Sequence, residues 1–280
     1  MRARQGHEAV NATKCALCKD NYALRDSHFI PKALYRLCRS PDPSKGVSSD
    51  PINLSPKGAV QSSYQLKSKL LCENCEDKFS KEGERIVIRD CFRGTNEFLL
   101  RDELRVANPD FVSDSSHWFS GAKLGSIINL HSYKYFAASM FWQGSAGRWS
   151  GPGSNEWRGT LGEKYQEEFR QYLLGICPFP HGALLVIFIA NEVDPLIFAT
   201  VTSSKKENGY HLHKFYIPGV EFRMFLGSRI EAPILSLFEY LKTDTIFVLQ
   251  DSRSNPGFPD IVNWVRSTKP KGKLQQYSKK

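Results

Sequence analysis

Two pairs of cysteines, each with the spacing Cys-x-x-Cys, constrain the fold of this chain more than any other feature. Cys15 and Cys18 form the first pair and Cys72 and Cys75 the second, with 53 residues between Cys18 and Cys72. Each pair offers two thiolates from one tight turn, and four thiolates suit the tetrahedral coordination of Zn2+. We therefore expect the four cysteines to hold one structural zinc ion. Four reduced cysteines that pack as small hydrophobic side chains are the alternative, but they would not explain the paired spacing.

The composition sets the class of protein and the compartment. Seven cysteines in 280 residues are few and odd in number for a disulfide framework, so the pairs indicate a metal site in a reducing compartment. Hydrophobic residues make up 41% of the chain and charged residues 24%, which excludes a wholly disordered or collagen-like chain. No apolar run approaches the roughly 20 residues that cross a bilayer, and the N-terminal segment lacks the apolar stretch of a secretory signal. We expect a soluble, cytoplasmic protein with no membrane partner.

The net charge of +9 is unevenly distributed along the chain. Residues 1–106 carry 19 Lys and Arg against 14 Asp and Glu, and residues 267–280 carry five Lys and no acidic residue. Residues 107–266 are close to neutral, with 14 basic and 15 acidic residues. Basic regions predict an anionic partner, and nucleic acid is the usual one. Lysines that only keep the chain soluble are the alternative, above all for the tail.

The hydrophobic pattern divides the chain into a cysteine-bearing domain at 1–106, a second domain at 107–266 and a basic tail at 267–280. In the second domain, two helical patterns precede a series of short apolar segments separated by turn residues, which predicts an α+β domain with an antiparallel sheet. The expected helices span 127–142, 160–174 and 234–241, and the expected strands 184–190, 196–202, 210–217, 222–226 and 245–249. The Ser-, Pro- and Gly-rich stretch 40–63 predicts a loop.

The cysteine-bearing domain has a recognisable order of elements. A Cys-x-x-Cys turn is followed by a β-hairpin that carries His28, a long loop, and a second Cys-x-x-Cys that opens a helix. The residues concerned are Cys15-Ala16-Leu17-Cys18, Asp26-Ser27-His28-Phe29-Ile30-Pro31 and Leu70-Leu71-Cys72-Glu73-Asn74-Cys75-Glu76. This pattern resembles the HNH endonuclease superfamily in its zinc-stapled ββα form, which is similar to a treble clef. The resemblance covers about residues 13–85.

The resemblance implies a metal-dependent endonuclease that hydrolyses phosphodiester bonds of DNA. His28 matches the general base, and Asp26 and Glu76 would hold a catalytic Mg2+ or Mn2+, which prefer oxygen ligands. The chain departs from the family pattern at Ser27, where an acid or a second histidine is usual, and has no Asn a few residues ahead of Cys72. Purely structural roles are the alternatives: a packed or zinc-supporting His28, a turn acid at Asp26 and a helix-dipole acid at Glu76.

Further expectations concern the partners. Lys32, Arg36 and Lys69 would contact phosphates if the domain binds nucleic acid, whereas Glu82 and Glu84 are expected in solvent. Residues 107–266 would choose the target, sense a ligand, or bind a protein partner or a second copy of the chain. The resemblance places such a nuclease in prokaryotic anti-phage defence. The alternative function is a catalytically inactive zinc module that binds nucleic acid or protein.

Two further features of the second domain are not sufficient to predict a binding or metal site. His211 and His213 alternate on one expected strand and share a face, but two ligands without a nearby acid are not a metal site. Trp149 and Trp157 lie in a Gly-rich connection and would either stack on a base or ligand or cap the core.

Overall fold

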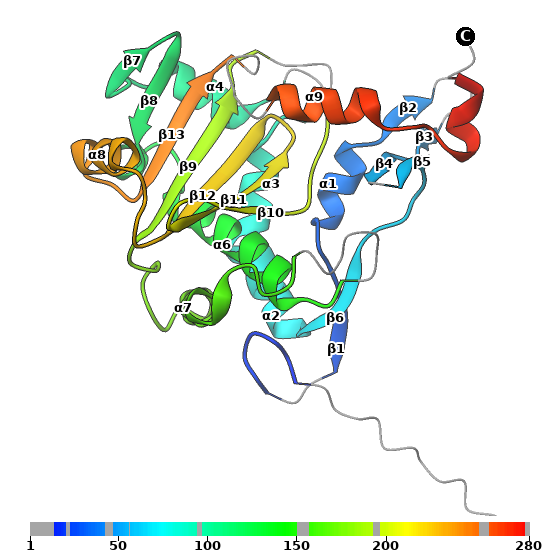
Figure 1. Ribbon diagram of the computed structural model, residues 1–280, viewed down its shortest axis with the longest axis horizontal. Helices are drawn as coiled ribbons and strands as arrows, with labels where there is room; N and C mark the ends of the chain where they lie inside the picture. The colour runs from blue at the N-terminus through cyan, green and yellow to red at the C-terminus, as the bar shows by residue number, and fades with distance from the viewer. Residues whose placement is uncertain are drawn as a thin grey trace, which may run out of the picture.

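The computed structural model describes residues 14–20, 23–42, 47–55, 57–93, 97–149, 157–192, 197–251 and 258–277. It confirms the predicted α+β class. A large, mostly antiparallel sheet has helices packed on it, and a two-stranded ribbon followed by a helix carries Cys72 and Cys75 (Figure 1). Across these residues, no helix combines the length and the apolar character that a membrane crossing needs.

The cysteine-bearing part is a β-ribbon followed by one long helix. β1 (Leu24–His28) pairs antiparallel with β6 (Lys67–Cys72), and α2 (Glu73–Phe79) begins at the next residue. α2 continues through a π-helical turn, η1 (Ser80–Glu84), into α3 (Arg85–Asp90). The order strand, strand, helix is the predicted one. However, β1 pairs with a strand that is distant in sequence, not within a local hairpin.

The segment between β1 and β6 contains more ordered structure than its composition predicts. α1 (Lys32–Leu37) is followed by two hairpins, β2 (Ser40–Asp42) with β3 (Val47–Ser49) and β4 (Ile52–Ser55) with β5 (Gly58–Gln61). The prediction of a loop over 40–63 was therefore wrong for these strands. Strand pairing uses backbone N–H and C=O groups, which polar residues offer as readily as apolar ones.

The large sheet has the strand order β10-β11-β12-β9-β13-β8-β7. Its members are β7 (Phe111–Ser113), β8 (Ser116–Ser120), β9 (Ala183–Ala190), β10 (Ser203–Lys206), β11 (Tyr210–Ile217), β12 (Val220–Gly227) and β13 (Thr245–Gln250). Within this sheet β13 and β9 run parallel, and the other neighbours are antiparallel. The strand expected at 196–202 is not formed over 197–202, and β10 follows it instead. The parallel pair lies at the centre of the sheet, where β9 is almost continuously apolar because side chains pack on both of its faces.

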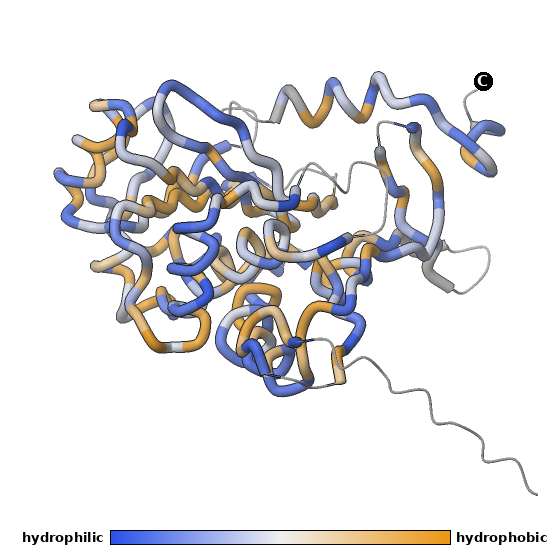
Figure 2. Tube along the Cα trace, turned by 60° about the horizontal axis from the view of Figure 1, so that its bottom comes forward, coloured by the Kyte–Doolittle hydropathy of each residue, from blue (hydrophilic) through white to orange (hydrophobic). Residues whose placement is uncertain are grey.

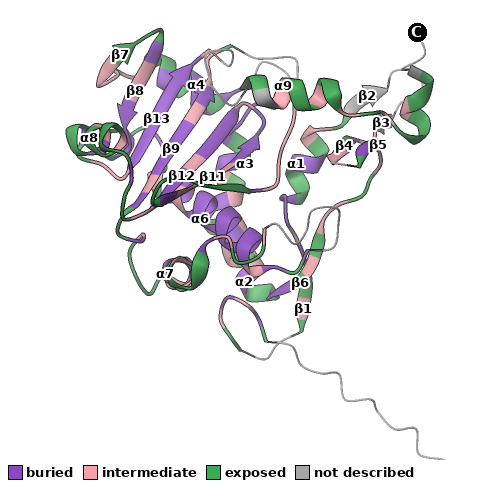
Figure 3. Cartoon of the chain, in the orientation of Figure 1, coloured by how far each residue is buried: buried purple, intermediate pink, exposed green. Residues whose placement is uncertain are grey.

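Helices pack on the sheet and beside it. They are α4 (Leu99–Val106), α5 (Gly121–Leu124), α6 (Leu130–Ala146), α7 (Gly162–Leu174), α8 (Ala232–Leu241), α9 (Phe258–Ser267) and the 3-10 helix η4 (Gly272–Tyr277). α6 is buried along most of its length, as Figure 3 shows, and the ring of Phe136 lies 5.8 Å from that of Phe215 and 5.7 Å from that of Phe222. These contacts form the main hydrophobic core, and a second cluster lies between the sheet and α8.

The long cysteine-bearing helix packs directly on α6. The ring of Phe79 makes edge contacts with Tyr135 at 6.0 Å and Trp142 at 6.1 Å. A Cβ atom on Gly83, in the π-helical turn, would lie 3.0 Å from the backbone of Phe136, so this close approach requires glycine. The hydrophobic core therefore continues from the cysteine-bearing helix into the sheet, across the predicted boundary at residue 106.

Candidate metal centre and neighbouring groups

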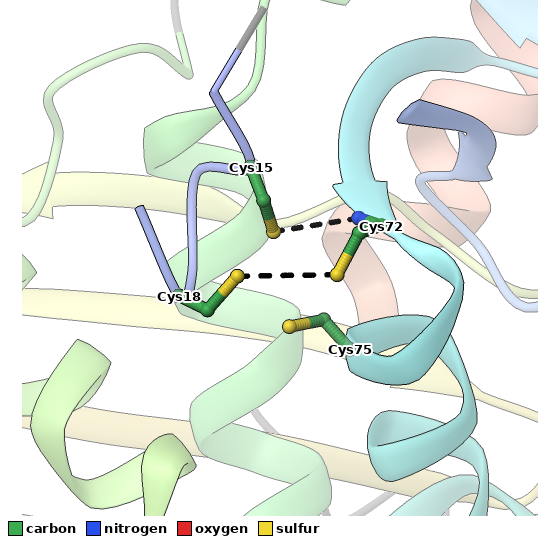
Figure 4. Close-up of side chains that lie close together, drawn as sticks. All are labelled: Cys15, Cys18, Cys72 and Cys75. Atoms are coloured by element: carbon green, nitrogen blue, oxygen red, sulfur yellow. Dashed lines mark hydrogen bonds between the residues drawn. The ribbon is translucent and has the colours of Figure 1, made fainter. Parts of the chain in front are cut away.

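The four cysteines predicted to form a cluster are brought together. Cys15 and Cys18 lie in one turn, closed by a hydrogen bond from the Lys19 N–H to the Cys15 carbonyl at 2.9 Å. Cys72 ends β6, and Cys75 lies in the first turn of α2. The four sulfur atoms all lie within 4.8 Å of one another (Figure 4). This cluster could hold a structural metal ion.

Backbone groups and burial give the cluster its electrostatics. A hydrogen bond from the Cys75 thiol, helped by the N–H groups of Cys72, Cys18 and Leu17, lowers the pKa of Cys15 to about 4. Burial raises the pKa of Cys18 to about 11, and the thiolate of Cys15 together with burial raises the pKa of Cys75. One thiolate is therefore favoured without a cation, whereas several thiolates together need a positive charge between them.

The turn that holds Cys15 and Cys18 is hydrogen-bonded to α7, which belongs to residues 107–266. Arg170 on α7 donates a hydrogen bond from Nη1 to the carbonyl of Leu17, between the two cysteines, at 2.7 Å. Two further N–H groups of Arg170 bind the Glu167 carboxylate, and this pairing lowers the pKa of Glu167 to about 2. Because Arg170 is held by Glu167, its guanidinium fixes the turn in a defined place beside α7.

Ser27 and Glu76 form a contact between β1 and α2. Ser27 is 1% exposed, and its hydroxyl donates to a Glu76 carboxylate oxygen while accepting the N–H of Leu71 at 3.2 Å. Burial raises the pKa of Glu76, and the hydrogen bond from Ser27 opposes that rise. Ser27 stands directly before the predicted general base, and it contacts Glu76, one of the two predicted ligands of a catalytic cation.

His28 follows Ser27 in the strand, so the two side chains point to opposite faces of β1. His28 is half-buried, and its Nε2 is buried without a hydrogen-bond partner. Burial lowers the pKa of His28, and the positive charges of Lys67 and Lys32 lower it further. His28 is therefore a neutral imidazole near pH 7, as a general base must be.

Asp26 does not join Glu76. It is exposed, shares the His28 face of β1 by strand alternation, and its carboxylate binds the Lys69 ammonium at 2.9 Å. That hydrogen bond lowers the pKa of Asp26. Within the described ranges, the four cysteines are the only group of three or more metal-binding side chains. The predicted pair of Asp26 and Glu76 around one catalytic cation remains a prediction.

Exposed cations lie near His28, and the positive charges of Lys67 and Lys32 act on its imidazole. Lys32 and Arg36 lie one turn apart on α1, and Lys69 is exposed on β6. Lys67, which is not among the predicted phosphate contacts, is paired with His28 across the ribbon. The position of Lys67 opposite His28 depends on the register between two strands that are distant in sequence. The sequence therefore shows that Lys67 is charged but not that it lies beside His28.

Glu84 was expected in solvent, and this expectation was wrong. Its side chain is half-buried, and burial, with the nearby charge of Glu76, raises the pKa of Glu84 to about 7. In a regular α-helix a separation of eight residues rotates a side chain by about 80°. The π-helical turn at 80–84 takes up about one extra residue, so Glu84 returns to the face of Glu76. Glu82 is half-exposed and contacts His131, with Oε2 3.1 Å from its Nε2.

The two tryptophans of the Gly-rich connection pack on the residue after His28. The ring of Phe29 stacks on Trp149 at 4.6 Å and touches Trp157 at 5.1 Å, which favours the role of a cap over the core. Gln143 on α6, 3% exposed, donates a hydrogen bond to the Phe29 carbonyl at 2.8 Å. His28 is thus held at a defined position by its covalent neighbour.

No family model, curated protein or solved structure matches this chain. The basis for a function is therefore the cysteine cluster and the groups around His28. These groups are a neutral imidazole, exposed cations and the Asp26 carboxylate paired with Lys69.

Proposed function

We propose that this protein is an HNH-like endonuclease that hydrolyses phosphodiester bonds of DNA, with a structural zinc ion in the cysteine cluster. The observation that carries the proposal is the placement of His28 at the end of β1. The ribbon and α2 are joined by the cysteines at the Leu24 end of β1 and by the contact between Ser27 and Glu76 next to His28. The order of elements is that of the ββα nucleases that the sequence resembles.

The geometry of the cluster supports zinc as its metal. Sulfur atoms bound tetrahedrally at about 2.3 Å from Zn2+ lie about 3.8 Å apart. The Sγ atoms of Cys18 and Cys72 are 3.9 Å apart. Four sulfur ligands with no oxygen ligand favour a soft cation, and a closed four-cysteine set is typical of a structural site.

The groups around His28 support hydrolysis of a phosphodiester. The neutral imidazole would take a proton from the attacking water, and Lys32, Arg36 and Lys67 would bind the phosphate oxygens. A Mg2+ or Mn2+ ion on the same face of β1 would supply positive charge to the scissile phosphate, and Asp26 is the predicted carboxylate ligand that shares this face with His28. Ser27 holds Glu76 on the opposite face of β1, where this contact joins the ribbon to α2.

A plasmid-cleavage assay with the zinc-loaded protein and added Mg2+ or Mn2+ tests this function. We expect His28→Ala to lower the cleavage rate by about 10²- to 10⁴-fold, the usual contribution of a general base. His181→Ala is the matched control, because His181 is exposed and lies outside the site. Cleavage by His28→Ala at the wild-type rate would remove His28 from the mechanism.

One observation favours a second candidate, a zinc module that binds nucleic acid or protein without cutting it. Asp26 is engaged by Lys69 and lies on the opposite face of β1 from Ser27, which contacts Glu76. Such a module would bind DNA with a steep salt dependence and would show no cleavage with any divalent cation. The place of the protein in anti-phage defence, and a partner or ligand for residues 107–266, remain predictions.

A further inference from the structure

The basic C-terminal segment is docked on the hairpin inserted between β1 and β6. The Ala59 N–H donates to the Lys269 carbonyl at 3.0 Å, and the Lys271 N–H donates to the Ala59 carbonyl at 2.9 Å. Pro270 thereby forms a parallel bridge with Ala59 in β5. Figure 1 shows η4, drawn in red, near the hairpin of β4 and β5. We call residues 268–277 the docked basic segment.

A glycine makes this docking possible. Gly58 has a φ of +132°, and a Cβ atom built on it would lie 2.8 Å from the Lys269 carbonyl oxygen and 3.0 Å from the side chain of Lys271. Any larger residue would collide with the backbone of the docked basic segment. The local shape of β5 therefore fits the placement of this segment, whereas lysines that serve solubility alone need no fixed position.

The docking gathers positive charge from two regions that are far apart in sequence. Lys57 in the hairpin and Lys269, Lys271 and Lys273 in the docked basic segment are all exposed. Over the described part of the chain, the ion pairs involve other cations, so these four ammonium groups face solvent without a carboxylate partner. Uncompensated, closely spaced ammonium groups repel one another and favour a polyanion.

The composition of the docked basic segment, in contrast to that of the neighbouring helix α9, argues for a nucleic acid over a lipid surface. α9 alternates hydrophobic and hydrophilic residues, and Trp264 is 40% exposed (Figure 2). The docked basic segment itself, however, offers Leu274 alone as an aliphatic side chain, and Leu274 is half-buried. A membrane-binding segment needs an apolar face beside its lysines, whereas a phosphodiester backbone needs only the charges.

We propose that the docked basic segment binds the phosphodiester backbone of duplex DNA and extends the phosphate-binding surface of the cysteine-bearing part. This inference rests on the proposed function for the class of substrate. The segment contacts phosphates and positions the duplex. It reads no base and takes no part in the cleavage step.

The first test replaces Lys269, Lys271 and Lys273 together by Gln. Binding of a fluorescent 20-base-pair duplex to the zinc-loaded full chain is measured by anisotropy from 50 to 200 mM salt, without added Mg2+ or Mn2+. Each lost phosphate contact lowers the slope of log affinity against log salt by about 0.9. We therefore expect the magnitude of the slope to fall by about 2.7 in this variant. Between 50 and 200 mM salt, the variant would then lose about 40-fold less affinity than the wild type.

A matched variant changes Lys164, Lys206 and Lys242 to Gln, with the same change in net charge. These exposed lysines lie on α7, on β10 and directly after α8. We expect the control to keep the wild-type salt slope. An equal fall of the slope in both triple variants would reduce the effect to net charge and overturn the proposal.

Gly58→Ala separates placement from charge. This variant keeps every lysine but displaces the docked basic segment, and we expect weaker DNA binding at unchanged net charge. Wild-type affinity and salt slope in Gly58→Ala would overturn the claim that docking matters. If the segment's triple variant kept the DNA slope of the wild type but lost binding to phosphatidylserine vesicles, the partner would be a membrane and the proposal would be wrong.

The outcomes for binding and for cleavage are independent. A wild-type protein that cuts plasmid through His28 while the segment's triple variant keeps the wild-type salt slope refutes this inference and leaves the proposed function standing. A salt slope that depends on the segment, without cleavage under any metal, supports this inference and refutes the nuclease. A wild-type chain that does not bind duplex DNA refutes both.

Discussion

Replacement of Ser27 by Ala is the perturbation that most directly probes how the ribbon is joined to α2. The Ser27 hydroxyl is 1% exposed and serves two partners, the Glu76 carboxylate and the Leu71 N–H. A hydrogen bond to a charged group contributes about 1.5–3 kcal/mol, and a buried N–H left without a partner costs about 1–3 kcal/mol. Glu76 is half-buried and regains part of its hydration, so we expect a loss of about 3 kcal/mol in the free energy of unfolding.

The assay is urea unfolding of the zinc-loaded protein at pH 7, followed by far-ultraviolet circular dichroism. Ser27→Ala is expected to lower the midpoint at an unchanged m value, since the exposed surface on unfolding stays the same. Ser68→Ala is the matched control, because Ser68 lies directly opposite Ser27 on β6 and is only half-buried. A loss below about 1 kcal/mol for Ser27→Ala, or an equal loss for Ser68→Ala, would refute the reasoning.

Two other predictions concern the cluster and a buried histidine. Cys18→Ser is expected to abolish the binding of one zinc ion per chain, measured by metal analysis after dialysis, whereas exposed Cys177→Ser keeps it; zinc retained by Cys18→Ser would contradict a four-cysteine site. Burial holds the pKa of His213 at about 4 against 6.5 when unfolded, so only the unfolded chain binds this proton between those values. Stability is full above pH 6.5 and falls by about 3 kcal/mol towards pH 4; His213→Leu should remove this part of the decline, and an identical pH profile would refute it.

The cysteine cluster could be predicted from sequence because its information is local. A Cys-x-x-Cys turn places two sulfur atoms together whatever the remainder of the fold does, and only one long-range contact then has to form. The helix after Cys72 and the α+β character of residues 107–266 follow from hydrophobic periodicity in the same way. His28 at the end of a strand is also a local property.

The contacts made by the predicted residues could not be read from the sequence, because they depend on pairing between distant segments. The register of β1 on β6 decides that Ser27 faces α2 and that Lys67 lies opposite His28. A slip of one residue would exchange the two faces of β1 and bring His28 towards Glu76. Local propensity does not distinguish these registers. The observed register is the one in which the buried Ser27 hydroxyl meets both of its hydrogen-bond partners.

The helical distortion can be predicted from sequence only in part. Gly83 predicts a weak point in the helix after Cys75, and the structure has a π-helical turn there. Its consequence, the burial of Glu84 next to Glu76, depends on the extra residue that the turn accommodates. Propensity locates a helical weakness but does not specify whether the helix ends, bends or widens.

The position of His28 is determined by both parts of the chain. The next residue, Phe29, is held by the Gln143 amide of α6 and by the ring of Trp149. Leu17, between the first two cysteines, is held by Arg170 of α7. A displacement of α6 would therefore move Phe29 and, through the peptide bond between them, His28. A displacement of α7 would move the first cysteine turn through the hydrogen bond from Arg170 to Leu17. Control of the site by a partner of residues 107–266 needs no hinge, since a displacement of either helix by about 1 Å already breaks the geometry of these hydrogen bonds.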